Sequence, residues 1–301
     1  HILTLKNNKK SLILHCGYPK AGSTYIIENI IKISINENCI NVNNNGELLE
    51  CFESIRNFSN ESFNAQYNKI KKKLLKNLSR KRNFFGYERI LNITDKPEKK
   101  IRFLKRFKKI SKDINLNLKL CIFLRNEIEM IESGYKEDYF RLIFRNYKNY
   151  LFKNYVHSIL DGNEKNLMNN LNFKSNLNNI YKIVTKKNVY VQNLENLKNN
   201  QEIIFKQILN FSGIKNFNIN LLSKTPLNSS RDKNLIGLIQ LRIKDYLFFK
   251  KKINFFTFVN IMEIFLRVIF FQKFLDKSVK INKKSKKKIM YKFNYIIKKL
   301  K

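Results

Sequence analysis

The sequence predicts an α/β fold in which a central parallel β-sheet has helices on both faces. Short apolar runs typical of buried strands alternate along the chain with longer amphipathic stretches typical of helices. Such alternation favours parallel strands, because the crossover between two parallel strands is usually a helix. Hydrophobic residues make up 43% of the 301 residues and aromatic residues 13%, so the chain can bury a sizeable core.

The first part of the chain begins with the apolar run SLILHC, which predicts a buried strand at 11–16. A tight glycine-containing loop and an amphipathic stretch follow, so we expect a helix over 24–35. Residues 36–47 form a polar stretch with no predicted element. Further along we expect a long helical region at 48–78, a strand at 82–90 with a turn at Gly86, and a basic helix at 97–112.

The second part continues the pattern of buried runs and helices. LNLKLCIFLRN predicts a strand at 116–126, and helical periodicity follows it from 127. After a loop at 161–163 we expect a helix at 176–186, a strand at 187–194 and a helix at 195–212 that Gly213 ends.

Two regions of the chain differ in composition. Residues 11–235 carry the alternating pattern and predict one α/β domain, whereas 236–301 predict a basic, apolar helical extension. Glu263 and Arg267 interrupt the most apolar stretch of this extension, which argues against a membrane-spanning helix. We expect this apolar stretch to be a helix in the protein core. The alternative is that residues 240–301 make peripheral contact with an anionic membrane surface.

The net charge of +37 indicates an anionic partner. Because lysines are spread along whole segments, charge alone does not distinguish a nucleotide, a nucleic acid or a membrane. Cys16 and Cys121 lie in predicted strands and no CxxC pair occurs, which favours buried free thiols. Free thiols are typical of a reducing compartment, so we expect a cytoplasmic protein, and association with a membrane stays open. The charged N-terminal residues predict no signal peptide within this sequence, and because the first residue is not Met, a leader that precedes it stays open. With only three histidines, a histidine-based metal site is not expected.

The most informative stretch is LILHCGYPKAGSTYI at 12–26, where a predicted strand runs through a glycine-containing loop into a predicted helix. A helix N-terminus offers unpaired N–H groups and the positive end of the helix dipole, so it binds phosphate groups. Gly22 lets the backbone approach an anion, and Lys20 supplies a mobile positive charge. Ser23 and Thr24 add hydroxyl donors.

The octet from Gly17 to Thr24 resembles the 5′-phosphosulfate-binding loop of the sulfotransferase family, whose pattern is roughly G-x-P-K-[STA]-G-[ST]-[ST]. It differs from the nucleoside-triphosphate loop GxxxxGK[ST], because its lysine precedes the second glycine. The resemblance implies a P-loop-like sheet and the co-substrate 3′-phosphoadenylyl sulfate. The nucleotide-binding residues that it implies in this loop are Gly17, Pro19, Lys20, Ala21, Gly22, Ser23 and Thr24.

A second part of the resemblance lies in KLCIFLRNEIEMIESGYKEDY. In the family, an arginine that ends a buried strand and a serine on the following helix bind the 3′-phosphate of the nucleotide. Arg125 and Ser133 stand at these positions. The chemistry fits, because arginine presents a planar fork to phosphate oxygens and serine adds a donor.

Two further stretches extend the resemblance over about residues 11–235. Residues 188–214 look like the strand, turn and helix that the family ends with a Phe-x-Gly pattern. TPLNSSRD at 225–232 resembles the loop that closes over the nucleotide in bacterial members, and a plain turn is the alternative. The candidate phosphate contacts in it are Asn228, Ser230 and Arg231.

The resemblance implies transfer of a sulfuryl group to an acceptor hydroxyl or amine, with a saccharide or glycolipid as the expected acceptor and no metal. We expect Lys20 to neutralise the leaving phosphate oxygen. Glu88, in FFGYERI, stands about where saccharide-modifying members have a catalytic glutamate, so it is the candidate general base. An ion pair with Arg89 or a lysine is the alternative for Glu88, and His15 is expected to be a satisfied core residue.

Two other classes of protein remain open. A P-loop kinase or NTPase needs a Mg²⁺-binding aspartate at the end of an apolar strand, but the strand LCIFLR ends in Arg125. A non-catalytic basic protein that binds nucleic acid or membrane would explain the charge, but it gives no reason for the octet at 17–24. Nucleic acid is therefore the less favoured partner.

Overall fold

The structure is a computed structural model. It describes residues 10–18, 22–91, 96–132, 135, 152–163, 165–223, 281 and 283–293. The chain divides into one unit of residues 1–223 and 283–301 and a second unit of residues 224–282. Every helix and strand among the described residues belongs to the first unit.

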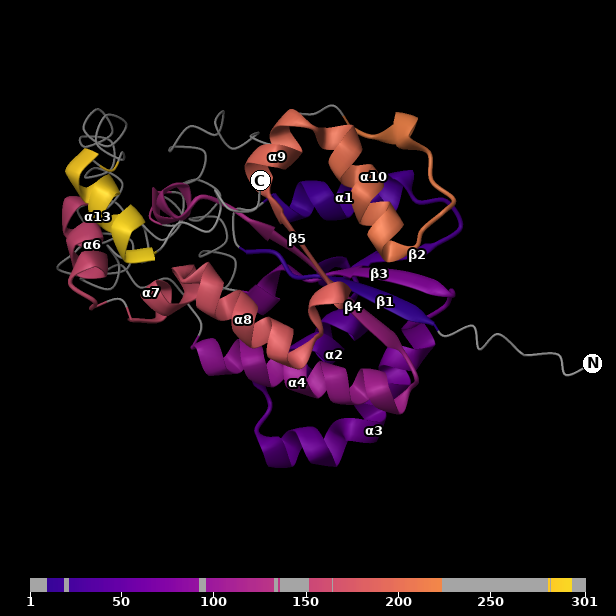
Figure 1. Cartoon of the computed structure of the whole chain (residues 1–301). Coiled ribbons are helices and arrows are strands. Elements are labelled where there is room, and N and C mark those ends of the chain that lie inside the picture. The colour runs from indigo at the N-terminus through magenta and orange to yellow at the C-terminus, as the bar shows by residue number, and fades with distance from the viewer. Residues whose placement is uncertain are drawn as a thin grey trace, which may run out of the picture. The chain divides into compact units, whose positions relative to one another are not determined.

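Five strands of the described chain form one parallel sheet, in the order β2-β3-β1-β4-β5 (Figure 1). The strands are β1 (Ser11–His15), β2 (Asn38–Asn41), β3 (Arg82–Gly86), β4 (Asn117–Leu124) and β5 (Val189–Asn193). β1 lies in the middle, and its last residue, His15, stands opposite Gly86 of β3 and Cys121 of β4. The predicted parallel sheet is confirmed. Its centre is built from the runs in β1 and β4, whose side chains are mostly buried.

Two strand predictions need correction. β2 lies within the polar stretch at 36–47, for which no element was expected. Its residues are half-buried at the sheet edge next to β3, where polar side chains fit and no run of apolar residues is required. β3 is shorter than the strand predicted at 82–90, because it ends at Gly86 and a 3₁₀ turn, η2 (Glu88–Leu91), follows.

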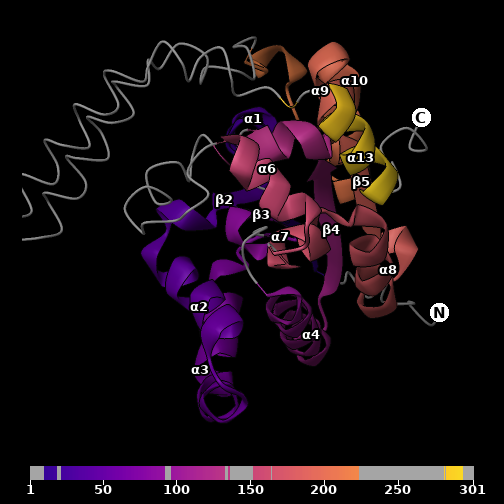
Figure 2. The ribbon, with the colours of Figure 1, turned by 90° about the vertical axis from the view of Figure 1, so that its left-hand side faces the viewer.

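Helices cover both faces of the sheet, as predicted (Figure 1). One face carries α1 (Ser23–Ile33), α9 (Leu194–Asn199) and α10 (Gln201–Ser212). The other carries α2 (Gly46–Asn57), α4 (Pro97–Asp113) and α8 (Phe173–Ile183), and α3 (Asn60–Asn77) packs against α2. Lying at one end of the strands are α6 (Phe152–Leu160), α7 (Lys165–Leu171) and α13 (Lys283–Phe293) (Figure 2).

The long helical region predicted at 48–78 is in fact two helices. Phe58 and Ser59 separate α2 from α3, and the hydroxyl of Ser59 caps the N-terminus of α3. The guanidinium of Arg106, on α4, donates to the carbonyls of Phe58 (2.9 Å) and Ile55 (3.0 Å). A buried arginine from another helix therefore satisfies the last carbonyls of α2, which the periodicity of the sequence does not reveal.

Other helices also differ from the prediction in their bounds. α8 spans Phe173–Ile183 and not 176–186, and the helix predicted at 195–212 is the pair α9 and α10. α6 and α7 lie where no element was predicted. The predicted end of α10 is confirmed, because Gly213 has a φ of 73° at its C-cap.

Most of the predicted extension, 236–301, lies outside the described residues, so the division of the chain at about 235 stays a prediction. Its described helix, α13, contacts α6. No helix among the described residues has the length and apolarity that crossing a bilayer requires.

Candidate functional site

The candidate site lies at the carboxyl ends of three neighbouring strands, β3, β1 and β4. β2 and β3 lie on one side of β1 within the sheet, and the chain then crosses over so that β4 and β5 lie on the other side of β1. Ligands of open α/β sheets bind outside the carboxyl ends of the strands at such a switch point. Gly17 follows β1, Glu88 follows β3 and Arg125 follows β4, so the fold brings these three predicted residues to one edge.

Gly17, two residues after β1, lies against Ser23 in the first turn of α1. A Cβ atom on Gly17 would lie 1.7 Å from Oγ and 2.8 Å from Cβ of Ser23, so the observed backbone leaves room only for glycine. Gly22 is the N-cap residue of α1 and has a φ of 72°, a left-handed conformation that glycine adopts at low cost. The backbone at both predicted positions therefore favours glycine.

The N-terminus of α1 is suited to an anion. No side chain caps it, and its first turn carries no acidic residue. The hydroxyl of Ser23 is buried and has no hydrogen-bond partner among the described residues. A buried hydroxyl without a partner costs about 1–3 kcal/mol, which a bound anion would recover. Together with the helix dipole, these features favour a phosphate or sulfate group at this position.

Two more buried polar groups at this edge were missed by sequence reasoning. Within the described chain, neither the hydroxyl of Tyr18 nor Oε2 of Glu127 has a hydrogen-bond partner. Tyr18 lies in the loop itself, with Nζ of Lys100 5.5 Å from its ring centre, and burial raises the pKa of Glu127 to about 7. Buried polar groups of this kind are typical of sites that a polar ligand or water completes. A tyrosine in a loop and a glutamate at a helix start show no pattern that would have revealed them.

The half-buried Glu88 and the exposed Thr24 lie next to each other at the candidate site. The hydroxyl of Thr24 donates to Oε1 of Glu88 over 2.9 Å. Arg89, considered above as an ion-pair partner of Glu88, instead has its guanidinium 3.1 Å from the carboxylate of Glu53. A half-buried carboxylate that solvent still reaches can accept a proton from a group that reacts beside it.

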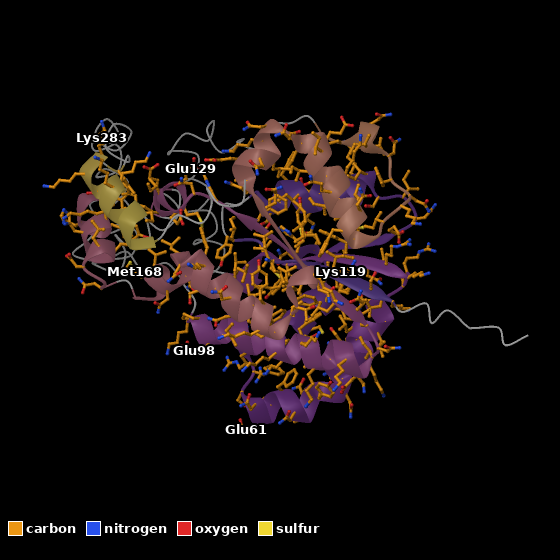
Figure 3. All side chains as sticks on the ribbon, in the orientation of Figure 1. Glu61, Glu98, Lys119, Glu129, Met168 and Lys283 are labelled. Carbon is orange, nitrogen blue, oxygen red and sulfur yellow. The ribbon has the colours of Figure 1, made fainter. Side chains whose placement is uncertain are left out.

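Arg125 lies at the end of β4, as predicted. Its Nε donates to Oε2 of Glu129 over 2.8 Å, and its side chain is 20% exposed. Glu129, labelled in Figure 3, belongs to the helix that begins at 127. An ion pair at Nε fixes the plane of the guanidinium, which is the group predicted to bind a phosphate.

Several predicted site residues lie outside the described residues, and their roles stay predictions. These are Pro19, Lys20, Ala21, Ser133, Asn228, Ser230 and Arg231. Ser223, the last described residue before this region, is hydrogen-bonded to α1. The hydroxyl of Tyr25 donates to the carbonyl of Ser223 (2.8 Å), and the N–H of Ser223 donates to Oδ1 of Asn29 (2.7 Å).

Metal-ligating side chains do not gather in the part of the chain that the structure describes. No group of three or more histidine, cysteine, aspartate or glutamate residues there could hold an ion. Cys16 and Cys121 are buried free thiols, as their positions in predicted strands indicated.

His15 was predicted to be a core residue with its hydrogen bonds satisfied, and only its place in the core is confirmed. It is fully buried, but neither ring nitrogen has a hydrogen-bond partner among the described residues. The rings of Phe84 and Phe123 lie 6.4 and 6.0 Å from its own. Burial lowers the pKa of His15 to about 4.

We expect His15→Leu to make folding less sensitive to acid. In the unfolded chain His15 takes up a proton near its ordinary pKa of 6.5, but in the folded chain only near 4. The stability that neutral His15 contributes is therefore complete above pH 6.5 and is lost as the pH falls toward 4. The loss for wild type is about 3 kcal/mol. Urea unfolding across this pH range should show a shallower dependence in the variant.

The quantity to compare between wild type and variant is the change in the free energy of unfolding with pH. The wild-type slope alone is not diagnostic, because Glu127 changes the stability with pH in the opposite direction to His15. Its raised pKa means that the folded state binds a proton more readily than the unfolded state, so Glu127 adds stability as the pH falls through 7. His157→Leu, at an exposed position on α6, is the control and should keep the wild-type slope. An unchanged slope in His15→Leu would contradict the assignment.

A parallel sheet with an uncapped helix N-terminus at its switch point is an arrangement found in α/β proteins that bind phosphate-bearing ligands. No protein-family model matches the chain, and no curated protein matches it.

Among solved structures, the chain is similar to a sulfotransferase from Alicyclobacillus acidocaldarius, with a TM-score of 0.44 and 13% identity over 77% of this chain and 91% of that one. It is also similar to the sulfotransferase domain of the Synechococcus PCC 7002 olefin synthase, with a TM-score of 0.40 and 14% identity over 86% and 95%. A mouse sulfotransferase complexed with PAP gives a TM-score of 0.38 and 15% identity over 74% and 68%. Likeness at this level carries no information about activity, which has to be argued from the residues of this chain.

Proposed function

We propose that the chain is a sulfotransferase, which moves a sulfuryl group from 3′-phosphoadenylyl sulfate to a hydroxyl or amine. The observation that supports this most strongly is the buried hydroxyl of Ser23, which faces Gly17 at the uncapped N-terminus of α1. A phosphosulfate group would supply acceptors for this hydroxyl and for the first N–H groups of the helix. The octet around it resembles the loop with which sulfotransferases bind that group.

Each residue at the carboxyl ends of the strands would have its own role in the sulfuryl transfer. The acceptor atom forms a bond to sulfur while the bond from sulfur to the 5′-phosphate oxygen breaks, which releases adenosine 3′,5′-bisphosphate (PAP). Glu88 takes the proton that the acceptor loses, and Lys20 neutralises the leaving phosphate oxygen. Arg125 and Ser133 bind the 3′-phosphate, which distinguishes this donor from nucleotides without one.

The acceptor that we propose is a saccharide or a glycolipid. The half-buried carboxylate of Glu88, beside the exposed Thr24, suits a hydroxyl group that approaches from solvent. The basic extension at 236–301 would favour an acceptor at an anionic membrane surface. Screening of saccharides and glycolipids with radiolabelled donor tests this, and transfer to amines alone would contradict it.

Calorimetry with PAP in the presence of EDTA tests the nucleotide site. We expect wild type to bind PAP without metal and Lys20→Ala to bind it more weakly. Arg125→Ala should weaken PAP binding about 10–100-fold and leave the affinity for adenosine 5′-monophosphate unchanged, because only PAP carries a 3′-phosphate. Lys32→Ala, in the last turn of α1, removes a lysine at the far end of the helix and should bind PAP like wild type.

The same measurements separate the competing classes of protein. ATP binding that requires Mg²⁺, without affinity for PAP, would replace the proposal with a kinase or NTPase. Polynucleotide binding with steep salt dependence, and no affinity for nucleotides, would favour a non-catalytic basic protein.

A further inference from the structure

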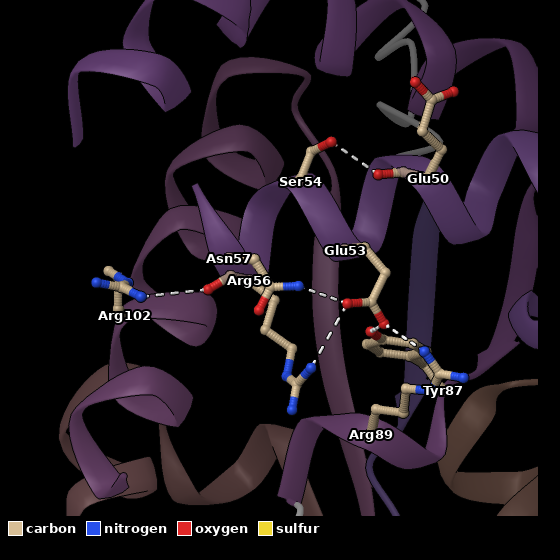
Figure 4. A network of polar contacts seen from close by, with 8 residues as sticks. All are labelled: Glu50, Glu53, Ser54, Arg56, Asn57, Tyr87, Arg89 and Arg102. Atoms are coloured by element: carbon tan, nitrogen blue, oxygen red, sulfur yellow. Dashed lines mark hydrogen bonds and ion pairs between the residues drawn. The ribbon is translucent and has the colours of Figure 1, made fainter. Parts of the chain in front are cut away.

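Glu53, on α2, is the centre of a hydrogen-bond network that no sequence motif indicates (Figure 4). Its Oε1 accepts from the hydroxyl of Tyr87 and, over 3.1 Å, from Nη1 of Arg89. Its Oε2 accepts from Nη1 of Arg56 (3.5 Å) and from Nδ2 of Asn57 (2.5 Å). Four donors therefore converge on one carboxylate, two from its own helix and two from the segment after β3.

The two donors from that segment stand on either side of Glu88. Tyr87 is fully buried, and its N–H also donates to the carbonyl of His15 over 3.2 Å. Residues 87–89 are thus attached to β1 through the backbone and to α2 through Glu53. Between these attachments, the side chain of Glu88 reaches the hydroxyl of Thr24 over 2.9 Å.

The charge of Glu53 strengthens this attachment. Burial alone would raise its pKa, but the hydrogen bonds from Tyr87 and Arg89 hold the pKa below the ordinary value for glutamate. Glu53 is therefore ionised at neutral pH. Hydrogen bonds to an ionised acceptor are stronger than bonds to a neutral one, so the carboxylate holds the segment more firmly than an amide of the same shape would.

We propose that Glu53 is a positioning residue for the transfer reaction, because it holds residues 87–89 so that the Glu88 carboxylate stays beside Thr24 at the phosphate loop. The kinetic consequence rests on the proposed function of Glu88. A misplacement of about 1 Å can lower a reaction rate about 100-fold. Loss of the Glu53 carboxylate should therefore lower turnover, whereas nucleotide binding, which depends on Ser23 and the N-terminus of α1, should be retained.

The test compares wild type with Glu53→Ala and Glu53→Gln. Turnover is measured as release of PAP from 3′-phosphoadenylyl sulfate in a saccharide mixture, which counts transfer to sugars and to water alike. Glu53→Ala should lower kcat about 10–100-fold while its Kd for PAP, from calorimetry, stays near the wild-type value. Glu53→Gln keeps an oxygen that can accept from Tyr87 and Arg89 but loses the charge, so its kcat should lie between those of Glu53→Ala and wild type.

Glu50→Ala is the matched control. Glu50 lies on the same helix, one turn before Glu53, and its carboxylate pairs with Lys73 over 2.5 Å. Removing it changes the charge of α2 by the same amount without touching the segment after β3. Glu50→Ala should therefore keep the wild-type kcat.

Amide hydrogen exchange at residues 85–91 gives a readout that does not depend on activity. Protection there should fall in Glu53→Ala and be kept in Glu50→Ala. Wild-type kcat together with unchanged protection in Glu53→Ala would overturn the positioning role. If Glu53→Ala does not fold, Tyr87→Phe, which removes one of the donors, takes its place in the same comparison.

Failure of the proposed function would look different. A wild-type protein that neither binds PAP nor releases it from the donor would overturn the sulfotransferase assignment. The exchange measurements would then still decide whether Glu53 holds residues 87–89 in place.

Discussion

Glu88→Gln is expected to lower turnover by about 10²–10⁴-fold and to leave the affinity for PAP unchanged. An amide cannot take up the proton of the acceptor, but it has the shape of the carboxylate. Its oxygen can still accept the hydrogen bond from Thr24, so the phosphate loop keeps its arrangement. Steady-state kinetics and calorimetry with PAP on the same preparations measure both quantities.

Glu98→Gln is the control for this change, because Glu98 is an exposed glutamate in the first turn of α4. It should have wild-type kinetics. A wild-type kcat in Glu88→Gln would exclude Glu88 as the general base and leave its bond to Thr24 as a structural contact. Equal losses of PAP affinity and kcat would instead show that the change damages the loop.

Gly17→Ala is expected to weaken PAP binding about 10–100-fold and to destabilise the protein by about 1–3 kcal/mol. The new Cβ would lie 2.8 Å from Cβ of Ser23, and rotation of the Ser23 hydroxyl cannot relieve that contact. The loop and the start of α1 must therefore move apart, which separates the groups that would bind the phosphosulfate. Calorimetry with PAP and urea unfolding measure the two effects.

Gly46→Ala is the matched glycine control. Gly46 is the first residue of α2, and a Cβ there would meet no atom within 4 Å. It should bind PAP like wild type and gain up to about 1 kcal/mol of stability, because alanine loses less backbone freedom on folding. Wild-type PAP affinity in Gly17→Ala would mean that the loop does not bind the nucleotide.

The parts of the fold that the sequence predicted are those in which burial leaves a pattern. β1 and β4 are central, so their residues form continuous apolar runs, and Gly213 ends α10 in a conformation that favours glycine. β2 lies at an edge and needs no such run. The break between α2 and α3 depends on Arg106, which reaches across from α4, and contacts of that kind are set by packing rather than by local sequence.

Some residues of the candidate site could likewise be predicted from the sequence, whereas others could not. The octet from Gly17 to Thr24 could be recognised because close approach of backbone to an anion demands particular residues at particular spacings. The partners of Glu88 could not, because Glu53 meets Tyr87 and Arg89 only through the packing of α2 beside β3. His15 was expected in the core, but whether its nitrogens find partners depends on neighbours from β3 and β4.

The central place of β1 also affects how the chain acquires its fold on the ribosome. β1 pairs with β3 about 70 residues later and with β4 about 105 residues later, so its apolar side chains are synthesised long before their neighbours. At about 5–20 residues per second, the strand waits roughly 5–20 s for β4. During that interval the apolar residues of β1 are exposed on the nascent chain, and chaperones are suited to bind such a segment.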